Sequence, residues 1–185
     1  MATDEVNKET LQERVDRDSR TAKAILEEIR RQHSKADRDG RTFTAVTEEQ
    51  LLSKLRSVNS PMIVWQSWSS SGTVGSTIKY SVGVTNPDAV DAVYVFAHVF
   101  VGAANIARNI GEALSAVDTR FPRLTMPAFP GVTIKAGGFA TLDFALTIPA
   151  GAQKTNYMGN SVLYRATWHD PAVYLDRGLF VFEVA

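Results

Sequence analysis

The chain has 185 residues, of which 44% are hydrophobic and 22% charged, with 20 basic and 20 acidic side chains and no cysteine. A neutral chain lacks the basic field that binds phosphate backbones, so nucleic acid is excluded as an expected partner. The absence of cysteine excludes disulfides, thiolate catalysis and cysteine-based zinc sites.

Charge divides the chain into two parts. Residues 1–58 carry 12 basic and 12 acidic side chains, whereas residues 59–185 carry 8 of each. The change falls at Asn59-Ser60-Pro61, where turn residues end a charged segment. We therefore expect a charged helical extension over 1–58 and a β-sandwich domain over 59–185.

Residues 4–35 are predicted to form one long helix, which Thr3 would cap, with acidic side chains early and basic ones late. Its apolar stripe is narrow, and five members of the stripe fall on the a and d positions of one heptad frame: Leu11, Val15, Ala22, Ile25 and Ile29. Because burial supplies most helical stability, such a helix should pair with copies of itself as a coiled coil or lie on a partner. The alternative is a solvated, partly disordered tail.

A turn over Lys35–Arg41 precedes a second, short helix over 48–57. Thr47 and Gln50 have the spacing of a capping box, in which each side chain bonds the other residue's backbone N–H. Asn59-Ser60-Pro61 ends this helix.

The segment Thr77–Val101 is predicted to form two strands joined by a short turn at Asn86-Pro87-Asp88, and to be the centre of the sandwich. The second of these strands, Val93–Val101, is apolar on both faces. One face carries valines and the other carries Tyr94, Phe96 and Phe100. We expect this aromatic face to be a contact with another copy or a partner protein, unless the chain itself covers it.

Further strands are predicted over 62–68, 132–135, 140–148, 161–168 and 178–184, separated by Gly and Pro turns. Between the second central strand and the later ones, residues 103–117 have the apolar spacing of an amphipathic helix, which is a candidate cover for the aromatic face. The predicted fold class is mainly β: an antiparallel sandwich with an amino-terminal helical extension and one helical insertion.

Three segments, Gly75–Pro87, Ile134–Phe144 and Ile148–Gly151, resemble the immunoglobulin-like sandwiches of bacterial adhesion modules. Within this resemblance, Asn160, Val162, Tyr164 and Ala166 stand where such folds place a tyrosine corner. The chain departs from the pattern in its helical insertion and in lacking both the paired cysteines and the central-strand tryptophan. A likeness at the level of the fold implies no particular activity.

No constellation of catalytic residues is present. The three histidines, His33, His98 and His169, belong to no zinc-binding motif, and no nucleophile elbow or phosphate-binding loop occurs. We therefore expect no enzymatic activity, no catalytic or metal-binding residues and no cofactor.

Aromatic residues supply the candidate ligand contacts. Trp65 and Trp68 lie three apart on a strand and so face opposite sides, which could leave one exposed to a sugar. Trp168, His169 and Tyr174 could form a second contact at a strand end. In both cases the alternative is that the side chains belong to the core or to a turn.

The amino terminus is polar and carries no apolar run of the secretion-signal type, and the longest uncharged apolar run, over 92–107, is too short to span a bilayer. We expect a soluble protein without membrane insertion, and export by a route without a signal stays open. The function expected is that of a non-enzymatic structural or assembly protein, such as a component of a virion or particle, that forms homo-oligomers or binds a partner protein. The alternative is a carbohydrate-binding or adhesion module that holds a glycan on exposed tryptophans and tyrosines.

Overall fold

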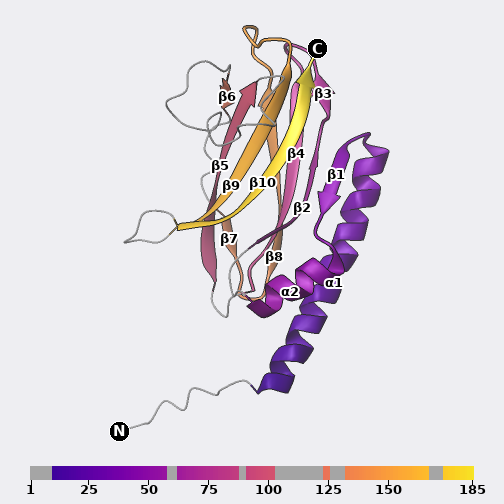
Figure 1. Cartoon of the computed structure of the whole chain (residues 1–185), viewed down its shortest axis with the longest axis vertical. Coiled ribbons are helices and arrows are strands. Elements are labelled where there is room, and N and C mark those ends of the chain that lie inside the picture. The colour runs from indigo at the N-terminus through magenta and orange to yellow at the C-terminus, as the bar shows by residue number, and fades with distance from the viewer. Residues whose placement is uncertain (1–9, 58–61, 88–90, 103–122, 126–131, 167–172) are drawn as a thin grey trace.

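A computed structural model of the chain describes residues 10–57, 62–87, 91–102, 123–125, 132–166 and 173–185. Two β-sheets face each other, and two helices lie along the outer side of the first sheet (Figure 1). The molecule therefore has three layers, and the first sheet is the middle one.

The first sheet, sheet A, has four strands, and all neighbours in it are antiparallel. In spatial order they are β1 (Thr42–Ala45), β2 (Met62–Trp68), β4 (Thr77–Thr85) and β8 (Phe139–Thr147).

The second sheet, sheet B, has five strands on its main path, with a sixth alongside. In spatial order they are β3 (Ser71–Gly72), β10 (Val173–Val184), β9 (Asn156–Ala166), β5 (Ala92–Gly102) and β6 (Arg123–Thr125), and β7 (Val132–Ile134) also pairs with β5. Only β3 is parallel to its neighbour, β10.

This strand order is immunoglobulin-like. β2, β4 and β8 correspond to strands A, B and E of such a sandwich, and β5, β9 and β10 correspond to C, F and G. The predicted fold class, an antiparallel sandwich with an amino-terminal helix, is confirmed.

The two central strands do not pair with each other, because they lie in different sheets. β4 lies in sheet A and β5 in sheet B. Asn86, directly after β4, explains the crossing: its backbone N–H donates to the Gly138 carbonyl (2.8 Å) and its amide donates to the Ile134 carbonyl (3.0 Å). These bonds tie the connection to the turn after β7 and lead the chain across to sheet B.

A tyrosine corner is present at Tyr157. The Tyr157 hydroxyl donates to the Gln153 carbonyl and accepts from the Gln153 N–H, both at 3.1 Å. Tyr157 is the second residue of β9 and is fully buried, which is the position and environment that the corner requires. The sequence suggested Tyr164 as the corner residue, and the side chain of Tyr164 lies outside the described part of the structure.

The long helix, α1 (Leu11–Arg38), begins later than predicted. Thr10 is its N-cap: the Thr10 hydroxyl accepts from the Glu13 N–H, and Glu13 accepts in return from the Thr10 N–H at 2.8 Å. This reciprocal pair fixes the start at Leu11, so the prediction of a cap at Thr3 is wrong. The helix also extends three residues past the predicted end, to Arg38.

The second helix, α2 (Glu48–Ser57), has the predicted bounds and the predicted capping box. The Thr47 N–H donates to the Gln50 side chain (2.9 Å), and the Gln50 N–H donates to the Thr47 hydroxyl (3.2 Å).

Two hydrophobic clusters fill the three layers. One lies between the sheets and is built around Tyr80, Phe180 and Phe182. The other, the helix-side cluster, joins the helices to the outer face of sheet A. It contains these buried residues: Ala22, Ile25, Leu51, Leu55, Met62, Val64 and Trp65. β2 contributes to both clusters, and all seven of its residues are buried.

β1 was not predicted, and it joins the amino-terminal segment to sheet A. Its four residues pair with Trp65–Trp68 of β2, and Phe43 packs in the helix-side cluster. β1 belongs to the segment before residue 58, so this segment contributes a strand to sheet A.

The remaining differences lie in the bounds of the strands. β9 and β10 begin five residues earlier than predicted, and the short strands β3 and β6 lie where turns were expected. The predicted helical insertion over 103–117 lies outside the described residues.

The tyrosine corner gives a stability prediction. Replacing Tyr157 by Phe keeps its ring stacked on Phe182 (5.5 Å between centroids) but removes the hydroxyl that both bonds to Gln153 need. We expect a loss of about 1 kcal/mol in the free energy of unfolding, measured by urea denaturation. Ser34→Ala, which removes an exposed hydroxyl of α1, is the control; equal stability of Tyr157→Phe and the wild type would contradict the corner.

The turn after β7 gives a pH prediction. The Lys135 ammonium (2.6 Å) and then the Ala136 N–H (2.8 Å) hold the Asp91 carboxylate and lower its pKa. A carboxyl with a lowered folded-state pKa stabilises the fold above the unfolded-state pKa, near 4, and loses that contribution as pH falls toward the folded-state pKa. Asp91→Asn should therefore cost stability at pH 7 and cost less at pH 3 in urea denaturation. An Asn penalty that grew on acidification would contradict this assignment.

Candidate interaction surfaces

α1 has a docked part and a projecting part. Ala22 and Ile25 are buried against the outer face of sheet A, and Ile29 is partly buried there. Three of the five predicted coiled-coil positions are thus used within the chain. The surface that covers these three side chains is the protein's own sandwich together with α2.

The other two positions lie on the projecting end. In Figure 1 the first turns of α1 extend past α2 and the adjacent end of the sandwich. Leu11 is 80% exposed and Val15 is 41% exposed. Because both share the heptad frame of Ala22 and Ile25, the apolar stripe that docks α1 continues onto a part of the helix that extends beyond the sheet.

A cleft of about 310 Å³ lies where the projecting end leaves the sandwich. Its lining residues come from α1, from the last turn of α2 and from two turns between strands: Arg17, Asp18, Thr21, Leu55, Pro87, Ala136 and Gly137. Asp18 is buried and lies 3.4 Å from the Arg17 guanidinium. The cleft is thus mixed in character, with a charged wall on α1 and an apolar floor at Leu55 and Pro87.

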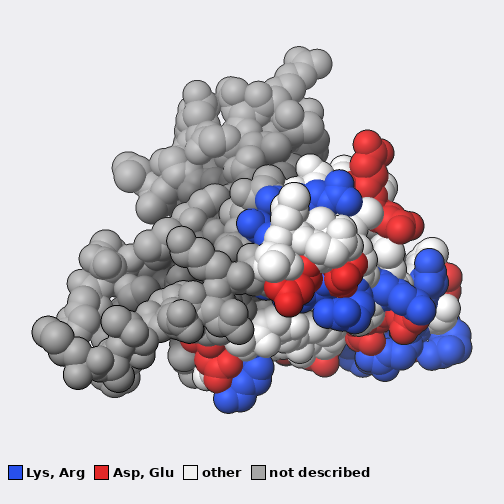
Figure 2. Space-filling model, turned by 90° about the horizontal axis from the view of Figure 1, so that it is seen from below, with Lys and Arg blue, Asp and Glu red and all other residues white. Residues whose placement is uncertain are grey.

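Charges of both signs are intermixed around this end of the molecule. Figure 2, which views it from below, shows acidic and basic side chains interspersed over the described surface. Within α1, Glu28 accepts from the Arg31 guanidinium at 2.5 and 2.7 Å, and this contact is the largest cause of the lowered Glu28 pKa. The described surface at this end is thus mixed in charge.

The two tryptophans of β2 are both covered. Trp65 is 1% exposed and lies in the helix-side cluster, where it stacks on Phe43 (5.9 Å between centroids). Trp68 is 8% exposed, packs on Phe180 across the sandwich (5.6 Å), and donates its indole N–H to the Val181 carbonyl (2.8 Å). They face opposite sides as predicted, but neither is an exposed platform for a sugar, because helices cover one face of β2 and sheet B the other.

The other predicted contact residues are only partly described. Trp168 and His169 lie outside the described residues. Tyr174 is in β10, and Tyr94, Phe96 and Phe100 are in β5; for these four the structure gives backbone positions only. Their register with the neighbouring strands is nevertheless defined.

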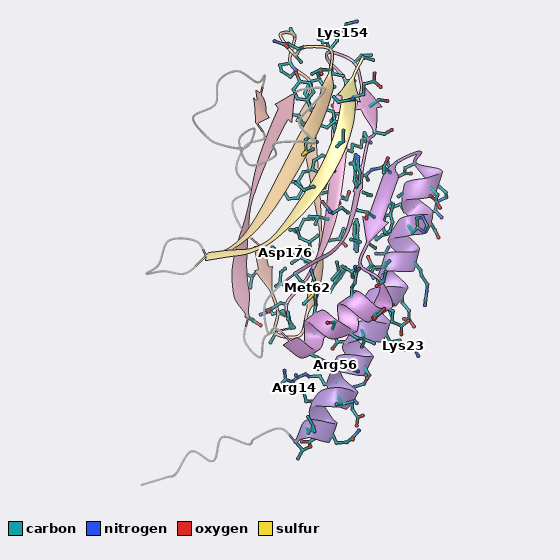
Figure 3. All side chains as sticks on the ribbon, viewed as in Figure 1. Arg14, Lys23, Arg56, Met62, Lys154 and Asp176 are labelled. Carbon is teal, nitrogen blue, oxygen red and sulfur yellow. The ribbon has the colours of Figure 1, made fainter. Side chains whose placement is uncertain are left out.

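A seam of contacts between β2 and β10 was not predicted. The Asp176 carboxylate accepts from the Ile63 N–H (2.9 Å) and lies 3.6 Å from the Lys54 ammonium of α2. The Gln66 side chain lies so close to Gly178 that a Cβ there would overlap its amide oxygen. Figure 3 shows Asp176 and Met62 at this junction of the two sheets. An isolated Asp in a strand gives no sequence signal of such a role.

A second polar cluster fixes β1 to sheet A. The Arg41 guanidinium donates to the Ser67 carbonyl (2.7 Å) and the Ser81 hydroxyl (3.0 Å), and Ser81 donates to Asp143 (2.5 Å). Burial lowers the pKa of Arg41, while the nearby carboxylates of Asp143 and Asp39 act in the opposite sense. The cluster bonds strands to one another.

Nothing in the described part of the chain resembles a metal centre or a membrane span. No group of three His, Asp or Glu side chains there has the geometry to hold a metal ion. Neither described helix is long and apolar enough to cross a bilayer.

Comparison with known proteins assigns no family. No family model and no curated protein matches the chain. Among solved structures, the C-terminal domain of wzt matches with 10% identity and a TM-score of 0.48, over 78% of this chain and 78% of that one. The CARDB domain of a Pyrococcus furiosus protein, in complex with di-metal ions, matches with 13% identity and a TM-score of 0.40, over 68% and 86%.

A cycloisomaltooligosaccharide glucanotransferase of Paenibacillus sp. also matches, with 16% identity and a TM-score of 0.42. The match covers 63% of this chain but only 13% of that one. At these identities and scores the similarities support no inference about function.

The division of α1 into docked and projecting parts gives a prediction. Ile25→Ala should lower the free energy of unfolding by about 2–5 kcal/mol because it leaves a cavity in the helix-side cluster, whereas Val15→Ala should change it by less than about 0.5 kcal/mol. Both are measured by urea denaturation at two protein concentrations. A cost for Ile25→Ala that depended on protein concentration would instead place Ile25 between copies.

Proposed function

We propose that this protein is a non-enzymatic assembly module that binds a neighbouring copy or a partner protein through the projecting end of α1. The observation that carries the proposal is the exposure of Leu11 and Val15 on the stripe whose other members dock the helix. An exposed apolar stripe continuous with a packed interface is a favourable place for a further protein contact.

Two further features support the proposal. The segment after residue 58 has only 16 charged side chains in 127 residues, which is few for a sandwich that is fully solvated on its own. The cleft beside Arg17 and Asp18 lies next to the projecting end and combines polar groups with an apolar floor, as the edge of a protein interface does.

The test is the mass of the full chain in solution, measured by light scattering on a sizing column across a dilution series. The double variant Leu11→Asp/Val15→Asp should shift the protein from an oligomer toward the monomer, because each change places a charge in the proposed contact. Circular dichroism should show the same fold, since both side chains lie outside the cores.

Ala24→Asp is the matched control, because Ala24 is an exposed apolar residue of the same helix that lies off the stripe. It should leave the mass unchanged. If the stripe variant and the control gave the same mass as the wild-type oligomer, the projecting end would not be the contact.

A further inference from the structure

The outer face of sheet B is apolar along β10. Leu179 and Val181 are 37% and 46% exposed, whereas Phe180 and Phe182, which alternate with them, are buried in the sandwich. Over residues 179–182, β10 is therefore apolar on both faces, and the side chains of Leu179 and Val181 on one of them are in contact with solvent.

The strand register shows how far this face extends. Two rows of residues run across β10, β9 and β5 in that order. One row is Leu179, Asn160 and Val99, and the other is Val181, Met158 and Val101. Directly opposite residues share a face of a sheet. The rows that contain the exposed residues of β10 thus continue into valine positions of β5.

The aromatic positions of β5 belong to the other rows. Buried Phe180 is opposite Gly159, which is opposite Phe100. Phe96 is opposite Leu163, which is opposite Asp176. The register therefore places the valine positions of β5 in the rows of Leu179 and Val181. The sequence alone had pointed to Tyr94, Phe96 and Phe100 as the residues that contact another copy or a partner.

The charges that flank the apolar residues on β10 have a symmetric arrangement. Reading every second residue gives Arg177, Leu179, Val181 and Glu183, with the apolar pair in the middle and opposite charges two residues beyond it on each side. A two-fold rotation about an axis at Phe180 places Arg177 of one copy opposite Glu183 of the other, and Leu179 opposite Val181. The pattern is complementary to itself.

We propose that the outer face of sheet B binds a second copy of this chain, face to face, about a two-fold axis at Phe180. The inference rests on the proposed assembly function and adds to it a second contact, for which it names the partner and the face. Pairing through the β10 edge is blocked, since the Trp68 indole N–H occupies the Val181 carbonyl and β3 pairs with Glu183 and Val184. The contact is therefore between faces, as in packed sheets.

The backbone of three strands sets an upper limit on the size of the face. β5, β9 and β10 have 11, 11 and 12 residues. At strand spacings of about 4.8 Å and rises of about 3.3 Å per residue, three such strands present roughly 500 Å² per copy, or about 1,000 Å² in total. This value is at the small end of specific interfaces, so the dimer should dissociate on dilution.

Charge exchange tests the two-fold arrangement. Sedimentation equilibrium of the full chain should show Arg177→Glu and Glu183→Arg each raising the dimer dissociation constant by roughly tenfold or more, because each places like charges opposite each other twice per dimer. The double variant should return it to within about threefold of wild type. Six residues of strand separate the two side chains by about 20 Å, so rescue cannot arise from their pairing within one chain.

A second variant tests the apolar centre. Leu179→Asp should abolish the dimer, and thermal melts of every variant monitor folding; the charge variants leave both cores untouched. Failure of the double variant to rescue, or a wild type that is monomeric at all concentrations, would overturn the inference. If Leu11→Asp/Val15→Asp changed the mass of the oligomer and charge exchange did not, the face-to-face dimer would be overturned and the proposed role of α1 would be retained. Rescue without any effect of the α1 variants would support the face-to-face dimer and overturn the proposed role of α1.

Discussion

The rest of the structure depends on the burial of β2 on both faces. A strand with seven consecutive buried residues cannot belong to a two-layer sandwich that is open on one side, so sheet A needs a third layer. α1, α2 and β1 supply it. The fit is close at Gly83 of β4, where a Cβ would overlap the Trp65 indole nitrogen, so the ring lies directly on the sheet. The amino-terminal segment is thus part of the fold and not an appendage.

This arrangement determines which surfaces remain for partners. The middle of α1 is committed to the sheet through Ala22 and Ile25, and the sheet face beneath it is covered. The seam formed by Asp176 and Trp68 closes the junction of β2 with β10. Within the described residues, one exposed large apolar side chain, Val74, lies in the turn before β4, and the other four lie at two places, the first turns of α1 and the outer face of β10. Both are consistent with an assembly role, and they lie on different layers.

Local signals were readable from the sequence. The Thr47–Gln50 box defined α2, and the alternation around Tyr80 and Val82 defined β4. Thr10 and Glu13 have the same signature, but the charge pattern favoured an earlier start. What could not be predicted is tertiary: which sheet β5 joins, or that helices cover Trp65. Alternation shows that a strand has two faces, but the layer on each face is set by residues far away in the chain.

The opposite burial of Trp65 and Trp68 has an experimental consequence. The two residues are three apart in one strand. The Trp65 indole contacts the helix layer, and the Trp68 indole contacts sheet B. Each is therefore a spectroscopic reporter of a different interface. With Trp168 and either one of the pair replaced by phenylalanine, fluorescence from the remaining indole would follow either the release of α1 or the separation of the two sheets. The chain thus carries its own means of showing whether its three layers come apart together or in turn.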